Sequence, residues 1–186
     1  MKRLRLGDWM GAVLFSLLVG IRLRQAANGS WFAFILALQS GIAAVLILTR
    51  RPEKQCAAWY QQATAWLCVV LPFGLQGDRI CIPVAFAGLA FSLWGLISLG
   101  QHFGIAPADR GLVISGAYRI VRHPIYLGEL VSYLGLGFAI MQLGNLLIIC
   151  VISILLLLRI HWEERMLSGY AGYQKLTPWR LIPLVW

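Results

Sequence analysis

Long apolar runs alternate with short polar segments along the whole chain of 186 residues. Six such runs are recognisable, at 9–21, 31–49, 57–75, 80–99, 125–143 and 145–158. A transmembrane helix needs about 20 mostly apolar residues, so each run predicts a span. The first and last runs are short and must draw on flanking residues such as Leu6 and Ile160. The pattern predicts an all-α, polytopic membrane bundle of about six helices, with five also possible.

The last two runs form one almost uninterrupted apolar stretch of 34 residues from Ile125 to Leu158. As a single helix it would be roughly 51 Å long, well beyond a hydrocarbon core of about 30 Å. The obvious break is Gly144-Asn145, a weak helix former followed by a residue that favours caps and turns. We therefore expect a C-terminal helical hairpin, followed by an amphipathic tail in the cytoplasm.

Two polar clusters flank this hairpin, Arg122-His123-Pro124-Ile125-Tyr126 before it and His161-Trp162-Glu163-Glu164-Arg165 after it. If the stretch folds back on itself, the clusters meet at one membrane boundary. Proline suits the first turn of a helix, whose positive end attracts a carboxylate that Arg119 or Arg122 can clamp. An Arg/His pair facing two carboxylates indicates a site for a zwitterionic cofactor and a lipophilic substrate.

Composition and charge set the class of protein and its topology. Hydrophobic residues make up 60% of the chain and charged residues only 12%, which indicates an integral membrane protein. If the N-terminus is cytoplasmic, the inner segments hold 13 lysines and arginines, at positions 2, 3, 5, 50, 51, 54, 110, 119, 122, 159, 165, 175 and 180. The outer segments hold Arg22, Arg24 and Arg79. This distribution predicts that both termini are cytoplasmic, and it explains the net charge of +9 without a nucleic-acid partner.

The remaining sequence features point to one membrane domain over residues 1–186. The chain has no repeat or long linker, so residues 1–99 are expected to form N-terminal membrane helices, and residues 100–186 the loop, hairpin and tail. No small-residue cleavage site follows the basic N-terminus, which leaves Leu6 to Leu23 as a span. Four cysteines, Cys56, Cys68, Cys81 and Cys150, lack metal-ligand spacing and are interpreted as small buried hydrophobes. No metal site is predicted.

The segment from Ser115 to Gly128, SGAYRIVRHPIYLG, followed by a hydrophobic hairpin and Glu163-Glu164, resembles a known family. It is similar to the isoprenylcysteine carboxyl methyltransferase and phospholipid methyltransferase superfamily. The members of this superfamily are integral membrane enzymes that use S-adenosylmethionine. The resemblance covers roughly Leu99 to Pro183. This chain departs from the family in having Ala117 where proline is usual, and in a shortened tail.

The resemblance implies that S-adenosylmethionine lies between the Arg-His-Pro turn, the last two spans and the Glu-Glu segment. It implies a cofactor-binding set of Tyr118, Arg119, Arg122, His123, Pro124, Tyr126, Gly128, Glu163 and Glu164. By this resemblance, Arg122 and His123 are expected to bind the methionine carboxylate. A glutamate is expected to bind the ammonium or the ribose, and the tyrosines to contact the adenine or the sulfonium. The catalytic candidates are Glu164, Arg159 and Arg180. The two arginines would orient an anionic acceptor. An amine acceptor would need a glutamate as a proton sink.

Several alternatives stay open at this level. The glycines of Gly135-Leu136-Gly137 are either a helix-packing face or an adenine-admitting surface, and not a nucleotide-binding turn. The acceptor is an isoprenylcysteine-type carboxylate, a lipid amine or a small lipophilic molecule, and the oligomeric state is undetermined. A non-enzymatic transporter or assembly protein is the alternative, but transporters place ionisable residues near the midplane. Here Glu129 lies about one turn into its helix, which favours a boundary site in contact with the bilayer.

Overall fold

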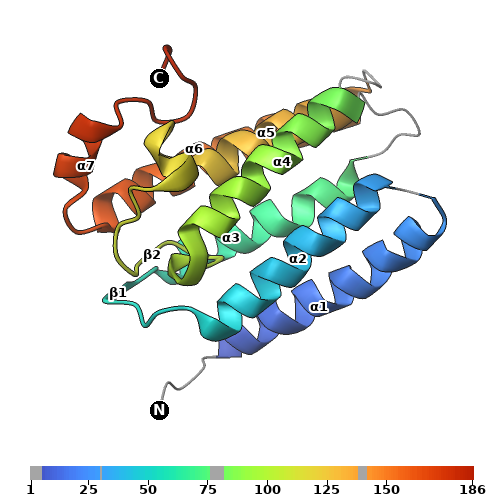
Figure 1. The fold of residues 1–186 in the computed structure, drawn as a ribbon, viewed down its shortest axis with the longest axis horizontal. Coiled ribbons are helices and arrows are strands. Elements are labelled where there is room, and N and C mark those ends of the chain that lie inside the picture. Colours follow the sequence, from blue (N-terminus) through green and yellow to red (C-terminus); the bar gives the residue numbers. More distant parts are fainter. Residues whose placement is uncertain (1–5, 30, 76–81, 138–141) are drawn as a thin grey trace.

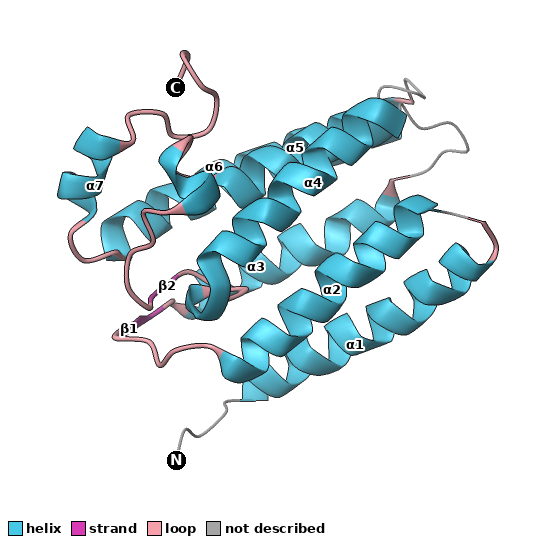
Figure 2. Ribbon diagram, viewed as in Figure 1, coloured by secondary structure: helices cyan, strands magenta, loops and turns pink. Residues whose placement is uncertain are grey.

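The computed structural model describes residues 6–29, 31–75, 82–137 and 142–186. Six helices lie side by side, and a short seventh lies at one end of the bundle (Figure 1). They are α1 (Leu6–Ala27), α2 (Trp31–Thr49), α3 (Trp59–Val70), α4 (Ile82–Leu99), α5 (Pro124–Gly137), α6 (Leu143–Met166) and α7 (Tyr170–Leu176). Three short 3-10 helices are η1 (Leu71–Gly74), η2 (Gly100–His102) and η3 (Gly116–Arg119). Strands β1 (Gln55–Cys56) and β2 (Ala108–Asp109) pair antiparallel near α7, where most of the described loops gather (Figure 2).

The mainly helical fold and the membrane character are confirmed. Three helical segments in the described residues are long and apolar enough to cross a membrane: Gly7–Ala27, Pro83–His102 and Leu143–Met166. A shorter apolar helix, Ala33–Thr49, accompanies them. Each of the six apolar runs coincides with a helix, but α3 has only 12 residues and α5 only 14. The number of about six complete spans is therefore not confirmed.

Two boundaries differ from the prediction. The expected span over 57–75 stops being α-helical at Val70 and continues as η1, because Pro72 has no N–H to bond to the carbonyl of Cys68. The predicted break at Gly144-Asn145 is wrong, since α6 already begins at Leu143. Glycine and asparagine cost a helix only about 0.7–1 kcal/mol each, which is too little to exclude them from the first turn of α6. The connection between α5 and α6 falls at 138–141, outside the described residues.

The structure shows how the basic residues assigned to the first outer segment are held. Arg22 and Arg24 lie in the last turns of α1. Arg22 donates hydrogen bonds to the carbonyl of Leu36, at 2.9 Å, and to the hydroxyl of Ser40, both on α2. A long basic side chain at a helix end can therefore be satisfied by the neighbouring helix.

The cysteines are not uniformly buried. Cys68 on α3 is buried as predicted, whereas Cys56 and Cys150 are exposed on the protein surface, and Cys81 lies outside the described residues. Cys150 lies on α6, where an apolar residue can face outward because the surrounding solvent of a membrane helix is itself apolar.

Helices α4 and α5 approach each other more closely than ordinary side chains allow. A Cβ atom added to Gly128 of α5 would lie 2.4 Å from the backbone nitrogen of Ser92 on α4. One added to Gly135 would lie 2.5 Å from the backbone nitrogen of Ala85. Small residues at such contacts are a recurrent device of membrane helix packing. The packing interpretation of Gly135 is confirmed, and the contact fixes the start of α5, where Pro124 is fully buried.

Candidate functional site

The two polar clusters meet at the end of the bundle that carries α7, as the hairpin predicted. Arg122 Nη1 lies 3.5 Å from Glu164 Oε1, and His123 Nε2 lies 3.4 Å from the same oxygen. His123 Nδ1 is 3.8 Å from Glu163 Oε2. The hydroxyl of Tyr126 donates a hydrogen bond to Glu163. Residues separated by about forty positions in the sequence therefore form one charged cluster.

The C-terminal tail holds the Arg-His-Pro turn in place. The backbone N–H groups of Arg122 and His123 donate to the carbonyls of Trp179 and Arg180, at 2.9 and 3.0 Å. Arg122 Nη2 also donates to the carbonyl of Pro178 at 3.1 Å. These bonds satisfy donors just before the first turn of α5, which have no intrahelical partner. Nothing local in the sequence indicates this pairing, and sequence reasoning missed it.

Glu164 is the most heavily bonded group of the cluster. Its carboxylate accepts a hydrogen bond from the hydroxyl of Tyr170 at 2.6 Å and from Arg180 Nη2 at 2.8 Å, in addition to the contacts with Arg122 and His123. Its side chain is only 8% exposed. A carboxylate with this many hydrogen-bond donors holds several cationic and phenolic groups in fixed positions relative to one another.

Glu163, its neighbour in the chain, is placed differently. Its side chain is 21% exposed, and it lines the cavity described below. Arg159 Nη2 lies 3.8 Å from Glu163 and donates to the carbonyl of Ile105 at 2.6 Å. The guanidinium of Arg159 also lies over the ring of Tyr126, 4.9 Å from its centroid, and the ring of His123 stacks parallel to that ring. Glu163 thus keeps a free edge toward a ligand while Glu164 does not.

A cavity opens beside this cluster, and its lining combines a polar and an apolar set of side chains, called here the polar wall and the apolar wall. The polar wall consists of residues from the turn before α5 and from the ends of α6 and α7, including Arg122, His123, Glu163, Tyr170 and Tyr173. The apolar wall comes from four helices and the loop after α4: Phe15, Val69, Leu99, Ile105, Leu112 and Ile125. Such a cavity can hold a polar group at one end and a hydrocarbon at the other.

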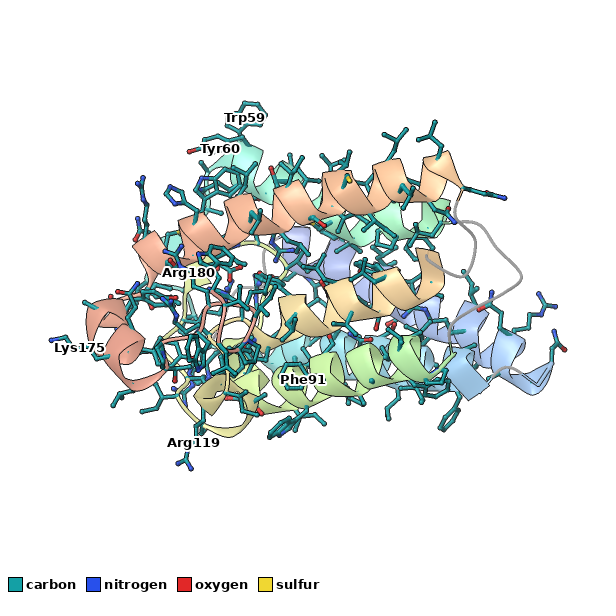
Figure 3. All side chains as sticks on the ribbon, turned by 90° about the horizontal axis from the view of Figure 1, so that it is seen from above. Trp59, Tyr60, Phe91, Arg119, Lys175 and Arg180 are labelled. Atoms are coloured by element: carbon teal, nitrogen blue, oxygen red, sulfur yellow. The ribbon has the colours of Figure 1, made fainter. Side chains whose placement is uncertain are left out.

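The structure brings most, but not all, of the predicted residues to this cavity. Those that line it are Tyr118, Arg122, His123, Tyr126, Arg159 and Glu163. Glu164 and Arg180 lie behind them and contact the lining residues. Pro124 is buried at the start of α5. Arg119 is exposed and projects away from the body of the protein (Figure 3), and Gly128 packs against α4. The structure does not bring these last two to the cavity.

The tyrosines around the cavity are protonated donors and aromatic surfaces. Burial, together with the charge of Glu163, raises the pKa of Tyr118 well above its usual value. Burial raises the pKa of Tyr173 to about 12, and burial with the bond to Glu164 raises that of Tyr170. Tyr173 donates a hydrogen bond to the carbonyl of Tyr118 at 2.7 Å, which ties α7 to η3. None of these three phenols is suited to act as a base near neutral pH.

Several buried donors of the cavity wall lack a partner. The Nε atoms of Arg110, Arg122 and Arg159 are buried and have no hydrogen-bond acceptor among the described residues. All three arginines line the cavity. A buried donor without an acceptor costs about 1–3 kcal/mol. Three arginines of the cavity wall therefore have hydrogen-bonding capacity that no group of the described chain uses.

Comparison with known families identifies the segment that contains this site. Residues 81–172 match the family model described as phospholipid methyltransferase. The matched segment begins just before α4, contains both polar clusters and ends within α7, before the tail residues that bond to the Arg-His-Pro turn. A comparison with curated proteins gives no match.

Proposed function

The chain belongs, through residues 81–172, to the phospholipid methyltransferase family, and from this premise we propose that it transfers a methyl group from S-adenosylmethionine to a lipophilic acceptor. A membrane methyltransferase is what the family and the apolar helices support directly. The observation that carries the proposal is the meeting of Arg122 with Glu164 and of His123 with both glutamates, beside a cavity that also has apolar lining residues.

The residues present suit a zwitterionic, aromatic cofactor. The unpartnered Nε of Arg122, with His123 beside it, is suited to a methionine carboxylate, and the free edge of Glu163 to an ammonium or ribose hydroxyl. Tyr126 and Tyr118 offer aromatic faces for adenine or for the sulfonium. When bound, S-adenosylmethionine supplies an electrophilic methyl group that a nucleophile can attack in line.

The chain itself has mainly to orient the reactants and exclude water. Methyl transfer gains most from near-attack geometry in a dry site, which the buried cluster and the apolar wall provide. We assign Glu164 a positioning role, because its carboxylate contacts Arg122, His123 and Arg180 and does not belong to the cavity wall as described. Arg159 and Arg180 orient neighbouring groups in the same way.

The acceptor is proposed to enter from the bilayer. The apolar wall suits the chain of a lipid or of a small lipophilic molecule, whether its nucleophile is a carboxylate, a thiol or an amine. The excess of lysine and arginine at the end with α7 supports the proposal that this end, with both termini, lies on the cytoplasmic side.

Calorimetric titration with S-adenosylmethionine and S-adenosylhomocysteine tests the proposal. We expect the native protein to bind both, and Arg122→Ala, His123→Ala and Glu163→Ala to lose binding. Arg119→Ala is the matched control, because this arginine projects away from the cavity and should leave affinity unchanged. A folded native protein that binds neither compound in detergent or in lipid nanodiscs would overturn the enzyme assignment in favour of a transporter or assembly protein.

A further inference from the structure

The tail after α7 forms a turn that exposes a group of apolar side chains. Ile182, Leu184 and Val185 are exposed on the protein surface, Leu184 at 82% and Val185 at 74%. Their neighbour Leu181 is buried in the core cluster that α5 and α6 share. A group of exposed apolar side chains beside a buried anchor indicates a surface that contacts a protein or a membrane.

Backbone hydrogen bonds hold this turn in one shape. The N–H groups of Leu181 and Ile182 donate to the backbone oxygen of Trp186, at 2.9 and 3.0 Å, and the N–H of Trp186 donates to the carbonyl of Ile182 at 3.0 Å. Leu184 has a φ of 67°, in the left-handed region that a leucine rarely adopts. Backbone strain of this kind persists where the surrounding structure enforces it, and it clusters at functional segments.

The turn lies beside the start of α5. The carbonyls of Trp179 and Arg180, just before the turn, accept hydrogen bonds from the N–H groups of Arg122 and His123. Figure 1 shows the tail running back from α7 to this point, so the turn lies at the side of the bundle and not beyond its end. Helix α5 is apolar from its first turn, and a segment beside that turn therefore lies near the boundary between bilayer and water.

Charge and aromatic residues favour a lipid surface as the partner of this turn. Residues 165–186 contain Arg165, Lys175 and Arg180 and no acidic residue. The guanidinium of Arg180 lies over the ring of Trp186, 5.1 Å from its centroid. Basic side chains are attracted to anionic headgroups, and tryptophan is enriched at membrane interfaces. A second copy of this chain would bring the same positive charge, which opposes pairing through this surface.

We propose that residues 182–185 insert into the headgroup region of the leaflet at the α7 end, and that this contact holds the Arg-His-Pro turn in its ligand-binding position. The insertion is independent of the proposed function, whereas its effect on ligand binding rests on that function. The connection is short, because Ile182 is only two residues from Arg180, whose carbonyl accepts the bond from His123. Without the membrane contact, the tail would hold these backbone donors less firmly.

Spin labelling measures the depth of the turn. A nitroxide is attached at Leu184→Cys, after alanine has replaced all four native cysteines, in nanodiscs of phosphatidylcholine and phosphatidylglycerol that hold one copy each. Collisions with oxygen, which concentrates in hydrocarbon, are compared with collisions with a water-soluble nickel chelate. Leu157→Cys, at an exposed position of α6, is the reference in lipid. The native thiol of Cys56, exposed at the end of the bundle with α7, is the reference in water (Figure 1).

We expect the label at position 184 to meet oxygen more often, and the nickel chelate less often, than the label on Cys56, with values between the two references. The same discs test the link to the site by calorimetry. Leu184→Asp/Val185→Asp should lower S-adenosylmethionine affinity about fivefold or more, as expected for the loss of one hydrogen bond. Leu184→Met/Val185→Leu stays apolar and should keep the native affinity. The control Leu176→Asp, at an exposed position of α7 outside the turn, should also keep it.

Three results would overturn the inference. A label at position 184 that meets the nickel chelate as often as the label on Cys56 would place the turn in water. A label shielded from both reagents would place the turn against protein. Native cofactor affinity in Leu184→Asp/Val185→Asp would remove the link to the site. A native protein that binds no cofactor would instead contradict the proposed function, and the label at position 184 would still decide whether the turn inserts.

Discussion

Mutation of the two adjacent glutamates at the end of α6 should affect different properties, stability for one and cofactor binding for the other. Glu164 is buried and accepts bonds from Tyr170 and Arg180, with Arg122 and His123 close by, whereas Glu163 is more exposed and lines the cavity. We expect Glu164→Ala to cost mainly stability. We expect Glu163→Ala to cost mainly cofactor binding.

The magnitudes follow from burial and from the partners left behind. Glu164→Ala leaves the guanidinium of Arg122, whose side chain is 8% exposed, without its carboxylate. Breaking a buried ion pair costs about 3–5 kcal/mol, and the value should be near 3 because Arg122 keeps its bond to Pro178. Glu163→Ala loses one bond from Tyr126 at a site in contact with the cavity, which costs about 1–2 kcal/mol.

Thermal unfolding in detergent measures this difference. At about 2–4 °C per kcal/mol for a chain of this size, Glu164→Ala should lower the melting temperature by about 6–12 °C, and Glu163→Ala by about 2–8 °C. Calorimetry on Glu163→Ala, at a temperature where it is folded, should show no S-adenosylmethionine binding. The reasoning is refuted if Glu163→Ala is at least as destabilising as Glu164→Ala, or if it binds the cofactor with native affinity.

Two further predictions concern the helices and loops that support the site. Gly128→Ala should destabilise by about 1–3 kcal/mol, because its Cβ would meet backbone atoms of α4. Gly144→Ala has open space around it and should gain helix propensity of up to about 1 kcal/mol; a melting temperature equal in both variants would contradict this. Asp109 is buried, which raises its pKa, but bonds from Ser168 and Gly111 outweigh burial and lower the pKa below 3.8. A lowered pKa stabilises the fold above about pH 4 and ceases to do so as the pH falls through the folded value. The excess melting temperature of the native protein over Asp109→Asn should therefore be constant between about pH 7 and 5 and shrink below pH 4, and a pH-independent difference would argue against it.

The pattern of apolar residues predicted most of the fold, because helix formation in a membrane depends on local composition. The run over 31–49 corresponds to α2 at both ends, and the length of the stretch from Ile125 to Leu158 was enough to predict the hairpin. The hairpin in turn predicted that Arg122 and Glu164 meet. The turn was predicted at the wrong position, because the weak helix propensity of Gly144-Asn145 is too small to keep these residues out of α6.

Features that depend on contacts between distant segments could not be predicted in this way. The bonds that the N–H groups of Arg122 and His123 donate to the tail carbonyls join segments more than fifty residues apart and leave no periodic signal. The orientation of Arg119 away from the cavity depends on η3, a turn whose direction the sequence does not fix. Glu129 was noted only as a charge near a helix end, since its position in the cavity wall emerges only when α1, α3 and α6 are packed around it.

Methyl transfer in a lipid bilayer tests the central claim most directly. The purified protein, reconstituted in nanodiscs made from extracted membrane lipids, is incubated with S-adenosylmethionine that carries a labelled methyl group, and the organic extract is counted. The account predicts label in the extract with the native protein and with Arg119→Ala, and none with His123→Ala. Label that stays entirely in the aqueous phase with a folded, cofactor-binding native protein would contradict transfer to a lipophilic acceptor.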